Sequence, residues 1–483
     1  MQKVIYFTIS FFFNIALLNA QSSSKLPNIV LILMDDMGFG DLSCYGAADI
    51  NTPNLDKLAS EGIRFTNFVT SQAVCSASRS SLLTGCYANR LGISGALMPR
   101  SPIGLSHDET TIPELLKQKN YATAAYGKWH LGDHKTFLPR NHGFDEYFGI
   151  PYSNDMWPIG YDGKPAMSNT NKASHPPLPL IDGEETITTL NSLEQQSVLT
   201  GLLTDKAISF IERNKKLPFF IYLAHPMPHV PISTPDAFRG KSKQGLYGDV
   251  IQEVDANVGR MVKKIKQLGL DKNTLFIFTS DNGPWLNFGN HAGSTGGFRE
   301  GKGTTFEGGH RVPCIMRWKD EVPAGLVLNQ LASTLDIFTT IASITGASLP
   351  NKKIDGVDLY PLIKGDLTQK PRDEFYYYYR KNSLEAVRKE NWKLVFQHPS
   401  RSYINQIPGK DGLPGPAPEN IIMATALYDL TSDPFEKIDL KEKFPEIVKI
   451  LEAIAEKARQ DLGDELQNRI GDNVRSAGKI GGK

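Results

Sequence analysis

The stretch Asn28-Ile29-Val30-Leu31-Ile32-Leu33-Met34, which runs directly into Asp35-Asp36, decides the fold class. An unbroken apolar, β-branched run of this length predicts a strand buried on both faces of a parallel sheet. Similar runs predict strands at 121–126, Phe219–Ala224 and 274–279. Between them, periodicity and capping signals predict helices at 52–59, 111–119, 202–213 and 248–267. This alternation predicts an α/β fold with a large mixed, mostly parallel sheet flanked by helices.

The character of the sequence changes near residue 371, which divides an expected large α/β domain at 21–370 from a smaller α+β subdomain at 371–483. In the first domain, a Pro-, Gly-, Asn- and Ser-rich stretch at 151–189 predicts a long irregular insertion. In the second, short runs predict an antiparallel sheet and one amphipathic helix, from strands at Glu374–Tyr379, 384–388, 393–397 and 426–430 and a helix at Pro445–Leu462. The Gly- and Lys-rich end after Gly471 is expected to fray.

The composition is that of a globular protein, with 40% hydrophobic residues, 22% charged residues and a formal charge of +1. This balance gives no electrostatic basis for a nucleic-acid or membrane-surface partner. Lys3 and the apolar stretch 4–18, ending in Leu18-Asn19-Ala20, predict a secretory signal peptide at 1–20 and an exported protein, periplasmic or secreted. An uncleaved anchor is the alternative; no later segment has the pattern of a membrane span.

Four cysteines, Cys44, Cys75, Cys86 and Cys314, are too few to form a disulfide framework in an exported chain of this length. The sequence leaves open whether Cys44 and Cys86 form a disulfide.

Polar residues follow the ends of the predicted strands, namely Asp35-Asp36, Lys128 with His130, His229, and Asp281-Asn282. Because the carboxyl ends of parallel strands share one edge of a sheet, these groups are expected to converge on one pocket. Their carboxylates and amide oxygen suit Ca²⁺ and, less well, Mg²⁺, and a divalent ion would relieve the repulsion between the carboxylates. Taken singly, each residue could also be a turn residue, a surface charge or a structural histidine.

The segment Val74-Cys75-Ser76-Ala77-Ser78-Arg79-Ser80-Ser81-Leu82-Leu83-Thr84-Gly85 predicts a short helix that Gly85 terminates. Cys75 would lie at the helix N-terminus, where backbone N–H groups favour an anion, and Arg79 would project from the same face. This placement predicts a reactive thiol, with a buried structural cysteine as the alternative.

The spelling Cys-x-Ala-Ser-Arg-x-x-Leu-Leu-Thr-Gly resembles the signature of the type I sulfatases of the alkaline phosphatase superfamily, with Ala77 where proline is commoner. Two further segments resemble sequence motifs of this family, Ser280-Asp281-Asn282-Gly283 and Gly301-Lys302-Gly303-Thr304-Thr305. The stretch from Gly143-Phe144-Asp145 to Tyr152-Ser153-Asn154-Asp155 resembles the branch that holds arylsulfatase A and N-acetylgalactosamine-6-sulfatase. The resemblance implies an alkaline-phosphatase-like fold and sulfate ester hydrolysis.

By this resemblance, a formylglycine-generating maturation enzyme would oxidise Cys75 to 3-oxoalanine (formylglycine), and the hydrated gem-diol would attack the sulfur atom. The implied calcium ligands are Asp35, Asp36, Asp281, Asn282 and residue 75. His229 and Lys302 would assist the leaving oxygen, and His130 would take the remaining diol proton. Arg79 and Lys128 would orient the formylglycine.

The expected substrate is a sulfated polysaccharide or its oligosaccharides, from algae or from glycosaminoglycans. Adjacency to the motifs predicts that Asp155, Trp157, Trp285 and His291 rim the pocket, with the tryptophans stacking on sugar; structural packing is the alternative for the tryptophans. Two other functions stay open: a phosphatase or phosphodiesterase of the same superfamily, and a sulfated-glycan-binding protein without catalysis. The intact cysteine motif disfavours the first, and the presence of Cys75, Asp281, His229 and Lys302 disfavours the second.

Overall fold

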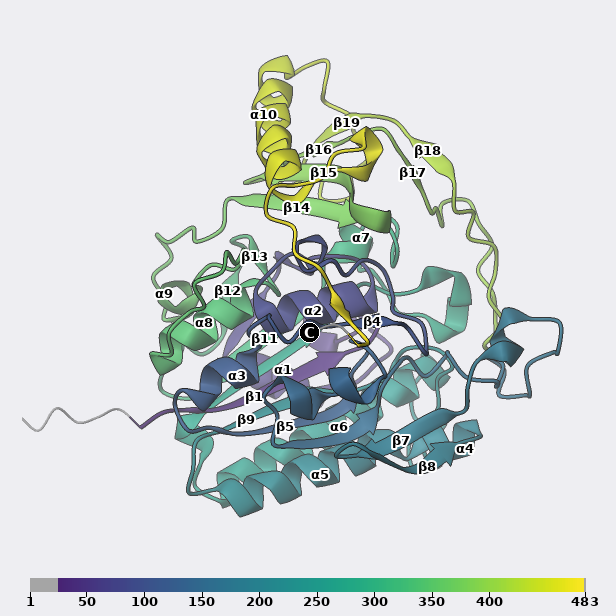
Figure 1. The fold of residues 1–483 in the computed structure, drawn as a ribbon, viewed down its shortest axis with the longest axis vertical. Helices are drawn as coiled ribbons and strands as arrows, with labels where there is room; N and C mark the ends of the chain where they lie inside the picture. Colours follow the sequence, from purple (N-terminus) through teal and green to yellow (C-terminus); the bar gives the residue numbers. More distant parts are fainter. Residues whose placement is uncertain (1–24, 482–483) are drawn as a thin grey trace, which may run out of the picture.

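The computed structural model describes residues 25–481, so the predicted signal peptide lies outside the described residues. A ten-stranded sheet forms the body of the molecule, and a four-stranded sheet lies above it in Figure 1. Among the helices of residues 25–481, none combines the length and the apolar character that a membrane span requires.

The large sheet has the strand order β12-β2-β11-β10-β1-β9-β5-β6-β7-β8. Its central strands β10, β1, β9, β5 and β6 are parallel, while β11, β7 and β8 pair antiparallel at the flanks. The strands span β1 Asn28–Met34, β2 Ile63–Phe65, β5 Ala122–Lys128, β6 Glu146–Ile150, β7 Leu178–Asp182, β8 Glu185–Leu190, β9 Phe219–Ala224, β10 Thr274–Ser280, β11 Cys314–Trp318 and β12 Leu326–Leu328. The predicted mixed, mostly parallel sheet is confirmed.

Alternate residues of β1 enter two separate cores, because successive side chains of a strand point to opposite faces. Val30 and Ile32 pack with the residues of α5 and α6, whereas Leu31 and Leu33 pack with those of α2, α3 and α8. The helices of the body span α1 Pro53–Ser60, α2 Cys75–Thr84, α3 Ile112–Lys117, α4 Leu193–Ser197, α5 Leu199–Asn214, α6 Leu246–Gln267, α7 Glu307–His310, α8 Asp336–Thr345 and α9 Tyr360–Ile363. Burial of β1 on both faces explains its unbroken apolar sequence.

The C-terminal subdomain is an antiparallel sheet, in the order β14-β15-β16-β19, with α10 packed against it (Figure 1). Its elements span β14 Glu374–Tyr379, β15 Ser383–Lys389, β16 Trp392–Val395, β19 Ala426–Asp429 and α10 Pro445–Leu462. Smaller two-stranded ladders pair β3 Phe68–Val69 with β13 Ala332–Ser333, β17 His398–Ser400 with β18 Ile421–Met423, and β4 Ile103–Gly104 with β20 Gly478–Lys479. The predicted α+β subdomain with an antiparallel sheet is confirmed.

Two segments are more ordered than the sequence predicts. The end of the 151–189 stretch is not irregular, because β7 and β8 form a hairpin that extends the large sheet. Much of β8 is exposed, so it lacks the apolar run that signals a strand. The tail after Gly471 does not fray: it returns to the large domain (yellow in Figure 1), where the Arg475 guanidinium donates to the Glu109 carboxylate at 2.7 and 2.8 Å.

All four cysteines are free thiols, so the open possibility of a Cys44–Cys86 bridge is not realised in the structure.

Candidate active site

Helix α2 begins at Cys75 and ends at Gly85, whose φ of +68° is the left-handed conformation expected of a glycine stop. Every residue of α2 is buried, because the helix is enclosed by the large sheet on one side and by other segments on the rest of its surface. The Cys75 Sγ lies 3.6 Å from Asp35 Oδ1 and 3.4 Å from Lys302 Nζ. Residue 75 therefore lies between the carboxyl group of Asp35 and the amino group of Lys302, at the start of α2.

The strand-end residues converge as predicted. Asp35 and Asp281 follow the neighbouring strands β1 and β10, Lys128 ends β5, and His229 follows β9. The Lys128 Nζ lies 2.5 Å from Asp35 Oδ2, and the Asp281 Oδ1 accepts the backbone N–H of Asp36 at 3.2 Å. The parallel arrangement of the central strands brings these distant segments together.

Three buried cations partner the three carboxylates of the site. Lys128 pairs with Asp35, the Lys302 Nζ lies 2.7 Å from Asp36 Oδ1, and the Arg79 Nη2 lies 2.8 Å from Asp281 Oδ2. Burial alone would raise the pKa of Asp35, but the positive charges of Lys128, His229, Arg79 and Lys302 outweigh it and hold that pKa far below its usual range. These side-chain cations thus relieve much of the repulsion between the carboxylates, a role that we predicted from the sequence for a bound divalent ion.

The pKa values of Asp281 and Cys75 are raised, because the cations of the site do not compensate for the burial of these two groups. Burial and then the charge of Asp35 raise the pKa of Asp281 to about 7, despite its contact with Arg79. Burial likewise raises the pKa of the Cys75 thiol to about 12, and Lys128 and Lys302 do not compensate for it. Burial therefore opposes the reactive thiolate that the helix N-terminus predicts and favours the protonated form of the unmodified thiol.

The site contains ligand atoms for a hard cation. One ligand atom each from Asp35, Asp36, Cys75 and His229 lies within 4.8 Å of the others. Beside them, the buried Asn282 Oδ1 has no hydrogen-bond partner within residues 25–481, while its Nδ2 donates to Asp36 Oδ1 at 2.6 Å. A buried amide oxygen without a donor, next to carboxylates, fits a Ca²⁺ or Mg²⁺ ligand.

The two predicted histidines lie in the site with different surroundings. The His229 Nδ1 is 2.6 Å from the Val230 carbonyl oxygen, so it carries the proton, and Nε2 faces Asp36 Oδ2 at 3.5 Å. The His130 Nε2 is 2.9 Å from the Leu97 carbonyl oxygen, and its buried Nδ1 has no partner among the described residues. Burial lowers the pKa of both rings, assisted by Lys302 at His229 and by Lys128 at His130, which favours neutral imidazoles.

Two of the predicted substrate residues stand at the mouth of the site. Trp285 and His291 are half-buried and line a small pocket together with Asp36. The Trp285 ring centre lies 5.7 Å from that of His229 and 4.8 Å from Lys302 Nζ. Trp285 therefore packs beside the imidazole of His229 and the ammonium group of Lys302.

The other two residues differ from each other. Asp155 is half-buried and faces Tyr161, whose hydroxyl donates to its Oδ2 at 3.4 Å. Trp157 has no exposed surface and belongs to the core beside α5 and α6. An indole with no exposed surface cannot stack on a sugar, so the packing alternative holds for Trp157.

Sequence reasoning missed several residues that contact the site. The Ser153 Oγ accepts a hydrogen bond from Lys128 Nζ at 3.0 Å, and the Tyr403 hydroxyl donates to the Lys302 carbonyl oxygen at 2.6 Å. Arg401 lies beside Trp285, 5.9 Å from its ring centre. Arg401 and Tyr403 come from an irregular C-terminal segment about which neither periodicity nor spacing gives a signal.

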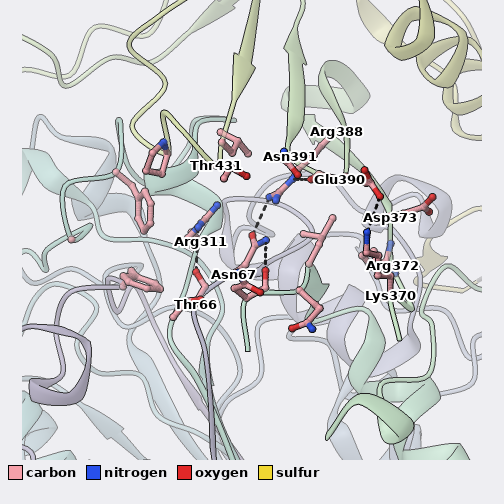
Figure 2. A pocket seen from close by; sticks show the side chains of 18 of the residues that line it. Thr66, Asn67, Arg311, Lys370, Arg372, Asp373, Arg388, Glu390, Asn391 and Thr431 are labelled. Carbon is pink, nitrogen blue, oxygen red and sulfur yellow. Dashed lines mark hydrogen bonds and ion pairs between the residues drawn. The ribbon is translucent and has the colours of Figure 1, made fainter. Parts of the chain in front are cut away.

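A cavity of about 690 Å³ lies away from this chemistry, between the two sheets (Figure 2). Its basic lining is neutralised internally: Arg311 pairs with Glu307 at 2.6 Å, and Arg372 pairs with Asp336 at 2.5 Å. Arg388 donates to Asn67 at 3.1 Å across the seam. None of the predicted site residues lines this cavity, so we regard it as a feature of the domain seam and assign the chemistry to the strand-end cluster.

Comparisons with known proteins agree with the strand-end assignment. The sulfatase family model matches residues 27–347, and the model described as the C-terminal region of aryl-sulfatase matches 370–477. The N-acetylgalactosamine-6-sulfatase of Canis lupus familiaris is 36% identical over 92% of this chain and 87% of that protein. Human arylsulfatase A is 37% identical over 88% of this chain and 85% of its own length.

Solved structures show the same architecture. The PsFucS1 sulfatase from Pseudoalteromonas sp. superposes with a TM-score of 0.77 at 30% identity, covering 90% of this chain and 91% of that one. Ps i-CgsB, solved in complex with k-i-k-neocarrahexaose, superposes with a TM-score of 0.75 at 29% identity, covering 93% of this chain and 95% of that one. The chain belongs to the type I sulfatases of the alkaline phosphatase superfamily, in the arylsulfatase A and N-acetylgalactosamine-6-sulfatase-like branch, and is a sulfuric ester hydrolase.

Proposed function

We propose that this protein is an exported sulfatase that removes sulfate groups from a sulfated polysaccharide or its oligosaccharides. The observation that carries the proposal is the placement of residue 75, buried between Asp35 and Lys302 at the start of α2. The names of the relatives support a glycan substrate, because they include an N-acetylgalactosamine-6-sulfatase and a protein solved in complex with k-i-k-neocarrahexaose. The apolar sequence at 4–18 supports export.

The modification of Cys75 to formylglycine fits the site. Formylglycine would supply a hydrated aldehyde oxygen as nucleophile, which a buried and protonated thiol does not provide. Lys302 and the Lys128–Asp35 pair surround this position and would fix the orientation of the nucleophile and of the sulfate oxygens. Arg79 holds Asp281 in place and donates to the Lys128 carbonyl oxygen at 2.8 Å, so we assign it a positioning role.

Asp35, Asp36, Asp281 and Asn282 would hold a divalent ion, with Ca²⁺ preferred over Mg²⁺. Such an ion would stabilise negative charge on the nucleophile and on the sulfate oxygens. Two observations support this assignment: the Asn282 Oδ1 has no donor in the described part of the chain, and the pKa of Asp281 is raised. A nearby cation would bind the first and lower the second.

We assign Lys302 and His229 to the leaving oxygen of the sugar. The ammonium group of Lys302 carries a proton, whereas His229, whose proton is on Nδ1 in the free site, would have to bind a second proton at Nε2 before it could donate one. Both lie against Trp285, which marks the side of the pocket that opens to the mouth. His130 lies at the end of β5, beyond Lys128, and we assign it the proton that leaves the nucleophile when sulfate is expelled. Its buried Nδ1 has no partner among the described residues, so it can accept that proton.

The test uses protein co-expressed with a formylglycine-generating enzyme and a panel of sulfated oligosaccharides, with desulfation followed by mass. An aryl phosphate and a phosphodiester serve as controls for the superfamily alternative. Release of sulfate from at least one glycan, with far slower release of phosphate, would support the proposal. Binding of sulfated glycans without turnover by protein that carries formylglycine would favour the non-catalytic alternative instead.

A further inference from the structure

The C-terminal subdomain contributes a cluster of polar residues to the mouth of the active site. The Tyr403 hydroxyl binds the Lys302 carbonyl oxygen, and the Arg401 Nη1 lies 3.3 Å from the same hydroxyl. Gly303, next to Lys302, has a φ of +80°, and a Cβ there would lie 2.9 Å from Arg401 Nη1 and 3.0 Å from the Tyr379 hydroxyl. The glycine thus allows Arg401 to approach the catalytic lysine's own segment closely.

The Trp285 indole connects Arg401 to the catalytic residues. The Arg401 guanidinium lies 5.9 Å from the Trp285 ring centre, Lys302 Nζ lies 4.8 Å from it, and the His229 ring centre lies 5.7 Å away. A sugar that packs on this indole while its sulfate occupies the pocket would bring its neighbour in the chain within reach of Arg401. Arg401 itself is mostly buried, so its position is held before any ligand arrives.

Two guanidinium groups of the cluster pair with one carboxylate. Arg401 contacts Glu419 Oε1 through Nη2 and through Nε at 2.8 Å, and Arg380 Nη2 lies 2.9 Å from Glu419 Oε2. A second carboxylate, Glu300, binds the Ser402 hydroxyl and the Tyr403 N–H instead. Arg380, Lys381 and Asn382 have φ values of 36°, 45° and 96°, a run of left-handed backbone that non-glycine residues rarely adopt. The fold maintains this unfavourable backbone at the place where it sets Arg380 beside Glu419.

A second aromatic ring beside Trp285 also carries a cation. The Tyr161 ring centre lies 6.4 Å from that of Trp285, and Lys172 Nζ lies 4.0 Å from the centre of the Tyr161 ring. Lys172 comes from the 151–177 part of the insertion and donates to the Asp155 carbonyl oxygen. The aromatic surface of the mouth is therefore flanked by cations from two segments that are remote in sequence.

We propose that Arg401, supported by Arg380, binds a second anionic group, a carboxylate or a sulfate, on the sugar next to the one that is desulfated. The inference rests on the proposed function, and it specifies the substrate as a glycan with negative charge on adjacent sugars. A guanidinium recognises either oxyanion by charge-assisted hydrogen bonds, and Trp285 holds the sugar between the two anionic sites. Arg401 is then a specificity-determining residue, whereas the strand-end cluster acts on the sulfate ester.

The test compares two pairs of sulfated disaccharides. In one pair the neighbouring sugar carries a carboxylate or its methyl ester, and in the other it carries a second sulfate or none. For each pair, the readout is the ratio of kcat/KM for the charged member to that for the neutral member. Because a hydrogen bond to a charged group contributes about 1.5–3 kcal/mol, Arg401→Gln should lower this ratio about 10-fold or more for at least one pair.

Two further variants guard against misfolding and nonspecific charge effects. Lys410→Gln removes an exposed cation from the same segment and should leave the ratio unchanged. Glu419→Gln removes the carboxylate that competes for Arg401 and should raise the ratio. Melting temperatures verify that each variant is folded.

The outcomes separate the two proposals. An unchanged ratio in folded Arg401→Gln for both pairs, or an equal loss in Lys410→Gln, would overturn the role of Arg401. Wild-type protein that hydrolyses an aryl sulfate but neither member of either pair would also overturn it, while retaining sulfatase activity. Failure of mature wild-type protein to hydrolyse any sulfate ester would instead overturn the proposed function.

Discussion

The floor and the mouth of the active site are built in different ways. On the floor, Asp35, Arg79 and Lys128 are fully buried, and each is paired with an opposite charge. At the mouth, Trp285 and Arg401 are only partly buried and lie in segments without regular secondary structure. The floor is positioned by strand ends and the start of α2, which suits chemistry that is common to all sulfate esters. The mouth is formed by loops, whose variation can change the substrate without changing that chemistry.

The largest effect is expected at residue 75 on the floor. Cys75→Ala removes the atom from which the nucleophile is formed, so turnover should fall by a factor on the order of 10⁴–10⁶ for aryl sulfate and glycan alike. Mass spectrometry of the tryptic peptide should show an aldehyde at residue 75 in active wild-type protein. Full activity in protein whose residue 75 is entirely cysteine would contradict the assignment.

Removal of divalent ions should come next in size and should again affect all substrates equally. Stripping with a chelator is expected to lower kcat at least about 100-fold, because the charge that stabilises the transition state is lost. Calcium should restore the rate, and Asp281→Ala should resist this restoration. Protein shown by elemental analysis to be metal-free that keeps its rate would disprove the ligand assignment.

The two tryptophans offer a matched comparison between core and mouth. Trp157→Ala should destabilise the fold by about 3–5 kcal/mol, because a fully buried indole is lost. Denaturant unfolding measures this cost, and the surviving folded fraction should keep its substrate preference. A Trp157→Ala variant that is as stable as the wild type but has an altered substrate preference would show that Trp157 contacts the substrate.

Trp285→Ala should show the reverse pattern. The loss for the natural oligosaccharide is expected to be about 1–3 kcal/mol in kcat/KM, that is, about 5- to 150-fold. A small aryl sulfate presents no sugar to the indole, so its kcat/KM should fall much less. Equal decreases of kcat/KM for the two substrates would show that Trp285 supports Lys302 and His229 instead of binding the sugar.

The smallest effect is expected at His291. Its ring lines the mouth pocket beside Trp285, and a hydrogen bond from an uncharged imidazole to a sugar hydroxyl contributes about 1 kcal/mol. His291→Ala should therefore lower kcat/KM for the oligosaccharide about 5-fold, measured at a pH where the variant's melting temperature is unchanged. An effect as large as that of the chelator would show that His291 belongs to the catalytic floor.

Sequence patterns predicted the central strands β10, β1, β9 and β5 and the three longest helices α5, α6 and α10, but not β6, β11 or α8. β9, β14 and α10 have the predicted bounds, and β1, β10 and α2 start at the predicted residues, because each has a periodicity or a stop signal of its own. The β7–β8 hairpin and the anchored tail were missed. Their order comes from pairing with a sheet edge and from the Arg475–Glu109 contact, and neither is visible in the local sequence.

The sequence by itself determined which chemical groups the floor contains and that they meet. Buried strands followed by Asp35, Lys128 and Asp281 must bring these residues to one edge, because parallel strands share the direction in which they end. The tertiary structure decided how these groups are paired, that burial raises the pKa of the Cys75 thiol, that Trp157 is buried, and that Arg401 lies beside Trp285. These properties depend on desolvation and on contacts between residues far apart in the chain, and such contacts exist only once the chain is packed.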